Sequence, residues 1–391
     1  MKDFTTTVND IQGFLTLKKP EMESFLKILV SLESPSHKKA LQQKILRILA
    51  NELEKTGLFV SYKAGKKTGG YLYARPQNRT KYKPLQLLVG HCDTVWPEKT
   101  LLEMPWKKKH DRISGPGIYD MKAGLTQIVF ALKAIKELNI SLQVTPIILI
   151  NSDEEIGSKE STVIIKRLAR ISNRAYILEP PLGLEGRLKT ARKGIGRFTV
   201  SVKGKAAHAG LDPAKGVNAI VELSYQIQKL HEMNNLDRGI SVNIGIIEGG
   251  ISPNVVAPVS KAVVDVRVLT EKDGIQIANK ILNLKPYLPD VELHVDGAIG
   301  RPPMEKTPAN QMLWEIAESQ GWLLGLELQE ATAGGGSDGN TTSLYTATLD
   351  GLGTPGDGAH ASHEFIKRNK LVERTALLTL LLMQKPLNVM S

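Results

Sequence analysis

The chain has 391 residues, of which 41% are hydrophobic and 23% are charged, a composition typical of a soluble globular protein. Its length exceeds what one hydrophobic core usually organises, so we expect two domains. The net charge of +11 does not indicate nucleic-acid binding, because the basic residues are scattered and no recognised nucleic-acid module accompanies them.

The first half of the chain alternates between helical and strand-like patterns. Apolar spacing predicts helices over residues 21–33 and 37–56. Ser36 is the expected N-cap of the second helix, and Gly57 its end. An amphipathic stretch that opens at Asp120 predicts another helix as far as residue 138. Short apolar runs predict buried strands over residues 85–89, 145–150 and 174–178.

A histidine or a carboxylate follows each of these three strands closely. Because ligands in open α/β sheets bind at the carboxyl ends of the strands, we expect a site at that edge.

From about residue 193 the pattern becomes β-α-β-β-α-β, the order of a ferredoxin-like unit. The elements cover residues 196–202, 218–233, 241–247, 261–269, 273–284 and 291–295. After Pro302 and Pro303 the chain returns to long helices and short strands. We therefore expect one α/β domain made of residues 1–192 and 304–391, with residues 193–303 inserted as a second domain.

Histidines and carboxylates recur in tight segments that contain Gly, Pro or strand-like apolar residues. A lone histidine after a strand is more often structural, and consecutive carboxylates usually form a solvated loop. Together, however, these residues are what a two-metal hydrolase needs to clamp a water and make hydroxide available near neutral pH. The segments are His91-Cys92-Asp93-Thr94-Val95, Gly115-Pro116-Gly117-Ile118-Tyr119-Asp120-Met121-Lys122, Ser152-Asp153-Glu154-Glu155, Leu178-Glu179-Pro180, Gly204-Lys205-Ala206-Ala207-His208-Ala209-Gly210 and Gly358-Ala359-His360.

With Gly334-Gly335-Gly336-Ser337-Asp338-Gly339, these segments resemble the M20 metallopeptidases, and within them the glutamate carboxypeptidase branch. The resemblance extends from about residue 20 to 385 in family order. It implies a zinc-peptidase-type catalytic domain with a central mixed sheet, a ferredoxin-like lid, and a homodimer formed through that lid. It also implies two divalent ions per chain, zinc or alternatively cobalt or manganese.

The resemblance assigns roles to the residues of these segments. Asp93 would hold the second ring nitrogen of His91, as carboxylates commonly do for zinc-binding histidines. Glu154 would act as general base toward the attacking water and pass the proton to the leaving amine. The implied metal ligands are His91 and Glu179 for one ion, Glu155 and His360 for the other, and Asp120 as the bridge between them.

Some of these assignments have competitors. The register within the acidic triplet rests on the resemblance, because Asp153 is also present. His363 is an alternative to His360, although the family pattern of an acidic-aromatic pair after the ligand favours His360. Cys92 could be a soft ligand, but on a strand it points to the face opposite His91 and so toward the core.

Three residues of the inserted domain complete the implied site. His208 would reach the active site of a partner subunit and stabilise the developing oxyanion. Arg267 would bind the free carboxylate of the substrate, for which a planar guanidinium is well shaped. Asn254 is either a substrate contact or a turn residue.

The sequence thus predicts a metal-dependent hydrolase that cleaves an amide bond next to a free carboxylate, most simply a glutamate-type carboxypeptidase acting through a hydroxide held by both ions. The alternatives are an N-acyl-amino-acid amidohydrolase and a catalytically silent binding protein. The basic charge suits a small acidic peptide or acyl-amino-acid substrate.

No secretory signal and no apolar run of the roughly 18–20 residues needed to cross a bilayer are seen in the sequence. The single cysteine, Cys92, excludes an intramolecular disulfide and fits a reducing compartment. We therefore expect a cytoplasmic protein without membrane association.

Overall fold

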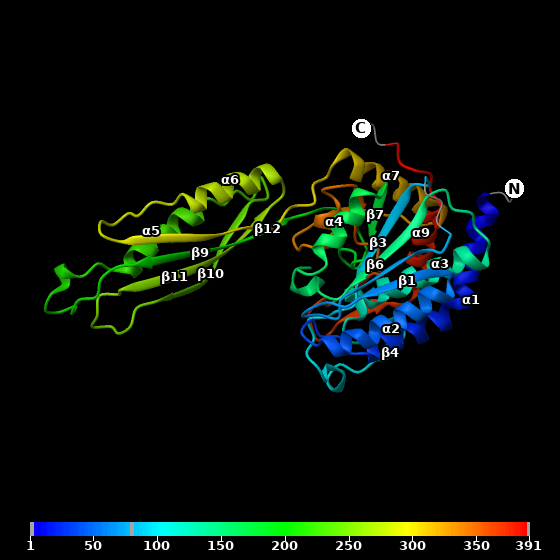
Figure 1. Ribbon diagram of the computed structural model, residues 1–391, viewed down its shortest axis with the longest axis horizontal. Coiled ribbons are helices and arrows are strands. Elements are labelled where there is room, and N and C mark those ends of the chain that lie inside the picture. Colours follow the sequence, from blue (N-terminus) through cyan, green and yellow to red (C-terminus); the bar gives the residue numbers. More distant parts are fainter. Residues whose placement is uncertain (1–3, 79–81, 389–391) are drawn as a thin grey trace. The chain divides into compact units, whose positions relative to one another are not determined.

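The computed structural model describes residues 4–78 and 82–388 and divides the chain into two units (Figure 1). The larger unit comprises Met1–Thr190, Lys306–Thr332 and Ser337–Ser391. The smaller unit comprises Ala191–Glu305 and Ala333–Gly336. The division lies close to the expected boundaries at 193 and 303, except that Ala333–Gly336, expected in the outer domain, is grouped with the insert. Each unit has its own hydrophobic core.

A six-stranded mixed sheet forms the centre of the larger unit, with the strand order β1-β2-β6-β3-β7-β14. The strands β6, β3, β7 and β14 run parallel, whereas β1, β2 and β6 pair antiparallel. Their bounds are β1 Leu58–Lys63, β2 Tyr71–Pro76, β3 Leu85–His91, β6 Thr145–Asn151, β7 Arg174–Ile177 and β14 Ala347–Leu349. This confirms the predicted α/β fold with a central mixed sheet.

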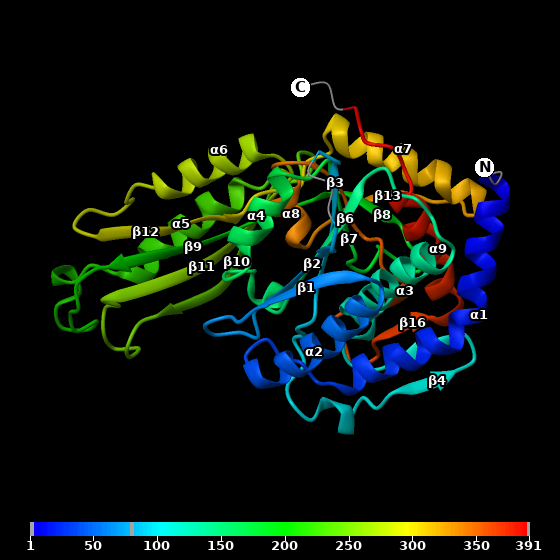
Figure 2. The same ribbon diagram turned by 45° about the vertical axis from the view of Figure 1, so that its right-hand side comes forward.

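Both faces of the sheet are buried, which explains why its central strands are mostly apolar. Leu88 and Ile148 pair across β3 and β6 and belong to the core on one face, whereas Leu87 and Ile147 belong to the core on the other. The first core includes residues of α1, α2, α3, α7 and α9, and the second includes residues of α4. The helices α1, α3 and α9 lie against one another (Figure 2). The bounds are α1 Phe4–Ser31, α2 Lys39–Lys55, α3 Ala123–Glu137, α4 Thr162–Arg170, α7 Pro308–Leu323, α8 Asp338–Thr342 and α9 Arg368–Leu382.

The first two helices differ from expectation at their N-terminal ends. Helix α1 begins long before residue 21 and continues through Pro20. Its apolar residues are buried at helical spacing on both sides of the proline, so packing overrides this local helix breaker. Helix α2 has Lys38 rather than Ser36 at its N-cap, without a side-chain hydrogen bond. It ends where expected, followed by Gly57 with a positive φ of 88°.

Two smaller sheets complete the larger unit's periphery. One has the strand order β15-β16-β5-β4, and the other pairs β13 with β8. The small four-stranded sheet matters for the site, because its strands β5 and β16 flank segments in which candidate ligands lie. The bounds are β4 Lys107–Lys109, β5 Arg112–Ser114, β8 Leu188–Arg192, β13 Glu330–Ala333, β15 Gly356–Asp357 and β16 Phe365–Lys367.

The inserted unit has the predicted β-α-β-β-α-β order. Its four strands are antiparallel in the sheet order β10-β11-β9-β12, as in a ferredoxin-like fold. One core contains apolar residues of the sheet and of both helices, so α5 and α6 cover the same face. The bounds are β9 Gly194–Lys203, α5 Ala219–Glu232, β10 Ser241–Gly249, β11 Val259–Val268, α6 Glu271–Leu282 and β12 Glu292–Arg301.

Within the described ranges, every helix is too short or too polar to span a bilayer.

Candidate metal centre

His91 is the last residue of β3, a strand that lies between β6 and β7 in the middle of the sheet. Its side chain is only 1% exposed. The neighbouring β7 ends at Ile177, and Glu179 follows two residues later. Because β3 and β7 run parallel, both side chains reach the same edge of the sheet. The structure therefore brings together two candidate ligands that lie 88 residues apart in the sequence.

Asp120 reaches the same place from a tight turn, Ile118–Lys122, directly before α3. Its backbone is not helical, with φ of −116° and ψ of 96°, and the following peptide bond is cis. The expectation that Asp120 opens a helix is therefore wrong by three residues, since α3 begins at Ala123. In this turn, the two carboxylate oxygens of Asp120 face two different histidines.

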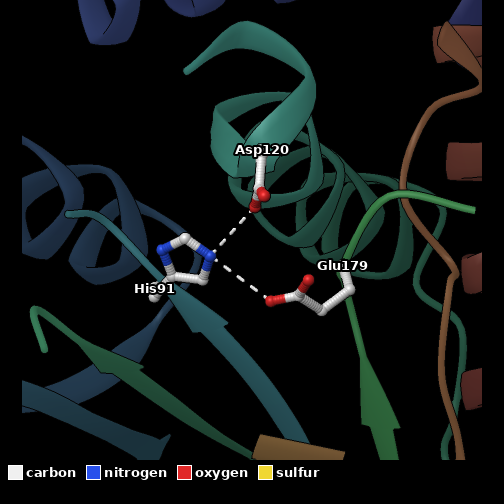
Figure 3. Close-up of side chains that lie close together, drawn as sticks. All are labelled: His91, Asp120 and Glu179. Atoms are coloured by element: carbon white, nitrogen blue, oxygen red, sulfur yellow. Dashed lines mark hydrogen bonds and ion pairs between the residues drawn. The ribbon is translucent and has the colours of Figure 1, made fainter. Parts of the chain in front are cut away.

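The first candidate group consists of His91, Asp120 and Glu179 (Figure 3). The Nε2 atom of His91 lies 3.1 Å from Oδ1 of Asp120 and 3.3 Å from Oε1 of Glu179. Figure 3 shows both carboxylates converging on this one ring nitrogen.

The second candidate group consists of Asp120, Glu155 and His360. The Nε2 atom of His360 lies 3.4 Å from Oδ2 of Asp120 and 3.2 Å from Oε2 of Glu155. Asp120 therefore directs one oxygen to each histidine. Among the described residues, His363 joins neither group.

The electrostatics of both groups are those of a cation site. The Asp120 and Glu155 carboxylates raise the pKa of His360 to about 10. Burial alone lowers the pKa of His91, but its contacts with Asp120, Asp93 and Glu179 raise it well above the ordinary value. Burial also raises the pKa of Glu155 to about 7. The carboxylates thus draw protons onto their neighbours, and divalent cations could take the place of those protons.

The donor set fits two such ions. Zinc binds histidine nitrogen and carboxylate oxygen at about 2.0–2.2 Å, so neighbouring ligand atoms of a tetrahedral site lie about 3.3–3.6 Å apart. The four nitrogen-to-oxygen distances within the groups are 3.1, 3.3, 3.4 and 3.2 Å. The three carboxylates and two imidazoles could therefore hold two divalent ions after moving apart by only a few tenths of an ångström, and the shared aspartate has an oxygen for each.

Asp93 contacts the second ring nitrogen of His91 with its backbone oxygen as well as with the expected carboxylate. The atom nearest to Nδ1 of His91 is the backbone oxygen of Asp93, at 3.0 Å, whereas its carboxylate Oδ1 lies 3.4 Å away. The Asp93 carboxylate also accepts hydrogen bonds from the backbone N–H groups of Glu154 and Glu155, both at 3.2 Å. It further accepts one from Ser36 Oγ at 2.8 Å. Ser36, expected to cap α2, instead holds the aspartate that links His91 to the acidic segment.

The acidic triplet after β6 divides into different roles. Asp153 is buried and accepts hydrogen bonds from the N–H groups of Glu160 and Ser161, at the start of α4. Glu155 carries the carboxylate that meets His360. Glu154 lies between them in the short turn Glu154–Ile156. Within the triplet, Glu155 rather than Asp153 is therefore the carboxylate that lies beside His360.

In the inserted unit, His208 and Asn254 lie on two segments that pair with each other. Ala209 donates its backbone N–H to the carbonyl oxygen of Asn254 at 2.9 Å, and both side chains are exposed. Nδ1 of His208 accepts the N–H groups of Gly210 and Leu211. A neutral ring in this arrangement carries its proton on Nε2, which makes that atom a hydrogen-bond donor.

Arg267 lies at the opposite end of the inserted sheet. It pairs with Ile195 at the start of β9, whereas the His208 segment follows the end of β9 at Lys203. These two ends are eight residues apart, or roughly 26 Å along the strand. The guanidinium is partly engaged already, because Nε and Nη2 contact Asp265 at 2.7 and 3.1 Å.

Glu364 is the acidic member of the acidic-aromatic pair that follows His360, and its role is not visible in the sequence. The carboxylate of Glu364 is buried and accepts hydrogen bonds from the segment that carries Asp120. The short spacing between His360 and Glu364 can be read from the sequence. It does not reveal that Glu364 contacts Asp120, which lies 244 residues away.

Histidines and carboxylates that converge at the carboxyl edge of an α/β sheet are the features of a metal-dependent hydrolase. The profile of the peptidase family M20/M25/M40 matches residues 87–384. The chain therefore belongs to this family, as its motifs predicted, and it is a metal-dependent peptidase.

Individual relatives agree with this assignment. Carboxypeptidase G2 of Pseudomonas sp. (strain RS-16) is 30% identical over 306 residues, which cover 76% of this chain and 73% of that protein. The aminopeptidase PepT from Bacillus cereus has a similar structure, with a TM-score of 0.77, 21% identity, and coverage of 93% of this chain and 98% of that one. The Bacillus subtilis YXEP protein, a dinuclear metal binding peptidase from the M20 family, gives a TM-score of 0.67 at 13% identity, covering 94% and 98% of the two chains.

Proposed function

We propose that this peptidase is a glutamate-type carboxypeptidase that binds two divalent metal ions and cleaves the amide bond next to a free C-terminal carboxylate. The observation that carries the proposal is the pair of ligand groups sharing Asp120, with each aspartate oxygen directed to a different histidine. The similarity to carboxypeptidase G2 supports the choice of substrate class.

His91 and Glu179 would hold one ion, Glu155 and His360 the other, and Asp120 both. Zinc suits this set of nitrogen and oxygen donors, while cobalt and manganese are alternatives. When bound, the ions supply Lewis acidity that polarises the scissile carbonyl and makes water more acidic. The description of YXEP as dinuclear supports a count of two.

Glu154 would take the proton of the attacking water and return it to the departing amine. Its neighbours suit this role, because Asp93 fixes the backbone of both Glu154 and Glu155 through their N–H groups. The general base and the adjacent ligand are thus held by one buried carboxylate.

Arg267 would bind the carboxylate of the substrate. Its side chain is 30% exposed and its Nη1 lies on the side away from the Asp265 pair, with only a long contact of 3.4 Å to the Gly334 carbonyl oxygen. A substrate carboxylate would therefore share the guanidinium with Asp265 or displace it. Asn254 would be a further substrate contact.

The inserted unit would form a homodimer, and His208 would act on the substrate of the partner subunit. Within one subunit, His208 and Arg267 lie at opposite ends of a sheet that is roughly 26 Å long between them. One small substrate cannot contact both ends of one sheet, so joint action requires two subunits. The edge strand β10 supports the dimer, because Ile246 and Ile247 on it are exposed. The donor Nε2 of His208 suits a developing oxyanion.

A substrate panel tests the proposed function. Peptides and acyl compounds that end in glutamate should be cleaved, and their C-terminal amides should react at least about 10²-fold more slowly, because the amide lacks the charged group that Arg267 would bind. Arg267→Ala should remove most of this preference. If N-acetylated neutral or basic amino acids are the better substrates, the chain is an N-acyl-amino-acid amidohydrolase with the same ligands.

The proposed base has its own test. Glu154→Gln should retain bound metal and lose about 10²–10⁴-fold in turnover, whereas Glu155→Gln should lose metal. The opposite pattern would show that the two roles are exchanged. Full metal loading without turnover of any amide in the wild-type chain would favour the silent binding protein.

Mixing two inactive chains tests the shared site. Glu154→Gln and His208→Ala chains should together recover part of the activity, since a mixed dimer contains one complete site. Background activity after demonstrated subunit exchange would exclude His208 from the reaction.

A further inference from the structure

The side chain of Glu364 is 1% exposed, and its carboxylate lies at the centre of a cluster of hydrogen-bond donors. Oε1 accepts the backbone N–H groups of Tyr119 and Asp120 at 2.9 and 3.1 Å. Oε2 accepts the backbone N–H of Gly117 and the indole N–H of Trp96, both at 2.8 Å. Each carboxylate oxygen thus accepts two hydrogen bonds. One of the four donors is the backbone N–H of Asp120, the residue shared by both ligand groups.

The backbone of Glu364 extends the same connection to the segment that carries His360. Its N–H donates to the carbonyl oxygen of Ala361 at 3.0 Å, within the loop that follows His360. Its carbonyl oxygen accepts the N–H of Gly115 at 3.4 Å. The next residue, Phe365, pairs with Ser114 across β16 and β5. One residue therefore joins three segments: the one after His91, the one before Asp120 and the one after His360.

This role requires a carboxylate rather than an amide. All four groups that meet the side chain are donors, and an ionised carboxylate is an acceptor only. A glutamine has almost the same shape, but its NH₂ group would face two of these donors without an acceptor between them. The four donors favour the ionised form of Glu364 in this buried place.

We propose that Glu364 is a positioning residue for the metal centre, which fixes Asp120 relative to His91 and His360 so that both ligand groups can form. This inference rests on the proposed two-metal function. Glu364 contacts none of the candidate ligand atoms with its carboxylate, and acts through the backbone that carries them. Partners of this kind, which orient ligands without binding the metal, commonly contribute 10–100-fold to metal affinity.

Glu364→Gln tests the proposal through metal affinity, measured by competition with a chromophoric chelator. The zinc affinity should fall by about 10- to 100-fold. The absorption spectrum of the cobalt-loaded chain should also change, because the ligand geometry is altered. Both measurements are independent of catalytic activity.

Glu222 provides a matched control in the inserted unit. It is also a fully buried glutamate, and it accepts the backbone N–H groups of Tyr287 and Leu288 and the side-chain N–H of Gln226. Glu222→Gln should lower the melting temperature as Glu364→Gln does, and leave the zinc affinity unchanged. The comparison separates a loss of fold stability from a loss of ligand positioning.

The proposal is overturned if Glu364→Gln binds two zinc ions with wild-type affinity. If that variant does not fold, Trp96→Phe replaces it, since it removes one donor and keeps the carboxylate. A loss of zinc affinity of about threefold or more would support the proposal, and an unchanged affinity would overturn it. A wild-type chain that binds no divalent ion would contradict the proposed two-metal function. It would also contradict the proposal that Glu364 positions metal ligands.

Discussion

The two ligand groups that share Asp120 differ in how they are held. His91 is 1% exposed and ends a central strand, with Glu179 just beyond the neighbouring parallel strand. His360 is 52% exposed and lies in a loop, where it adopts a positive φ of 59°. Its partner Glu155 lies in a short turn rather than on a strand. One half of the centre is thus part of the sheet, and the other half depends on loops.

The two ion sites are therefore not equivalent, although they share Asp120. Ligands on buried strands move little, whereas loops open locally at low free-energy cost. We expect the ion near His91 to bind more tightly and exchange more slowly than the ion near His360.

Asp120→Asn should have the largest effect, because it removes the negative charge that both groups share and replaces one of the two oxygens by an NH₂ group. We expect both ions to be lost and activity to fall to background. Metal analysis of the purified variant measures this directly, with the exposed Asp111→Asn as a control that should retain both ions. A variant that still holds two ions would show that Asp120 does not bridge.

Removing each histidine separately should distinguish the two groups. His360→Ala should keep one ion near His91, and His91→Ala should keep at most one ion near His360. The ion retained in His360→Ala should bind at least about tenfold more tightly, since a site with buried, preorganised ligands loses less on ordering. Isothermal titration of both metal-free variants with zinc gives the two affinities. The reverse order would refute the comparison.

Zinc release should occur in two phases of similar amplitude when the loaded wild-type chain is mixed with excess chelator. The faster phase belongs to the exposed group, because a chelator reaches His360 without opening the sheet. Stopped-flow absorbance of a chromophoric chelator resolves the phases, and His360→Ala should lack the faster one. A single phase for the wild-type chain would mean that the two ions leave together.

Ser36→Ala should have the smallest effect and should act on the buried group. It removes the hydroxyl that donates to the Asp93 carboxylate beside His91. We expect a loss of about 1 kcal/mol in the free energy of unfolding and a few-fold loss in affinity for the tighter ion. Denaturant unfolding and zinc titration measure the two effects. An affinity loss confined to the weaker ion would contradict this placement.

Much of the fold could be predicted from the sequence, because most of its helices and strands have a recognisable local pattern of apolar and polar residues. The central strands are mostly apolar, and the insert begins with a strand of alternating buried and exposed residues. Expectations failed where distant packing decides the outcome. Helix α1 continues through Pro20 because residues on both sides of it are buried.

The candidate ligands were also accessible, since their motifs surround them closely in the sequence. The groups that hold those ligands were not. Ser36 meets Asp93 across 57 positions, and Glu364 meets the Asp120 segment across 244. Such hydrogen bonds have no local pattern, because they join chain segments that only the folded sheet brings together. The roles of Glu154, His208, Arg267 and Asn254, the dimer and the cytoplasmic location stay predictions.

The sheet of the inserted unit also fixes the distance between His208 and Arg267 within one subunit. His208 and Arg267 are attached near opposite ends of β9 and β11, so their separation follows from the number of residues in those strands. Adding two residues to each strand would lengthen the spacing by roughly 7 Å and keep every side chain on its original face. Adding one would turn Arg267 toward the helices. Strand length, counted in pairs, therefore sets the distance between the two ends of the inserted sheet without changing which side chains face its helices.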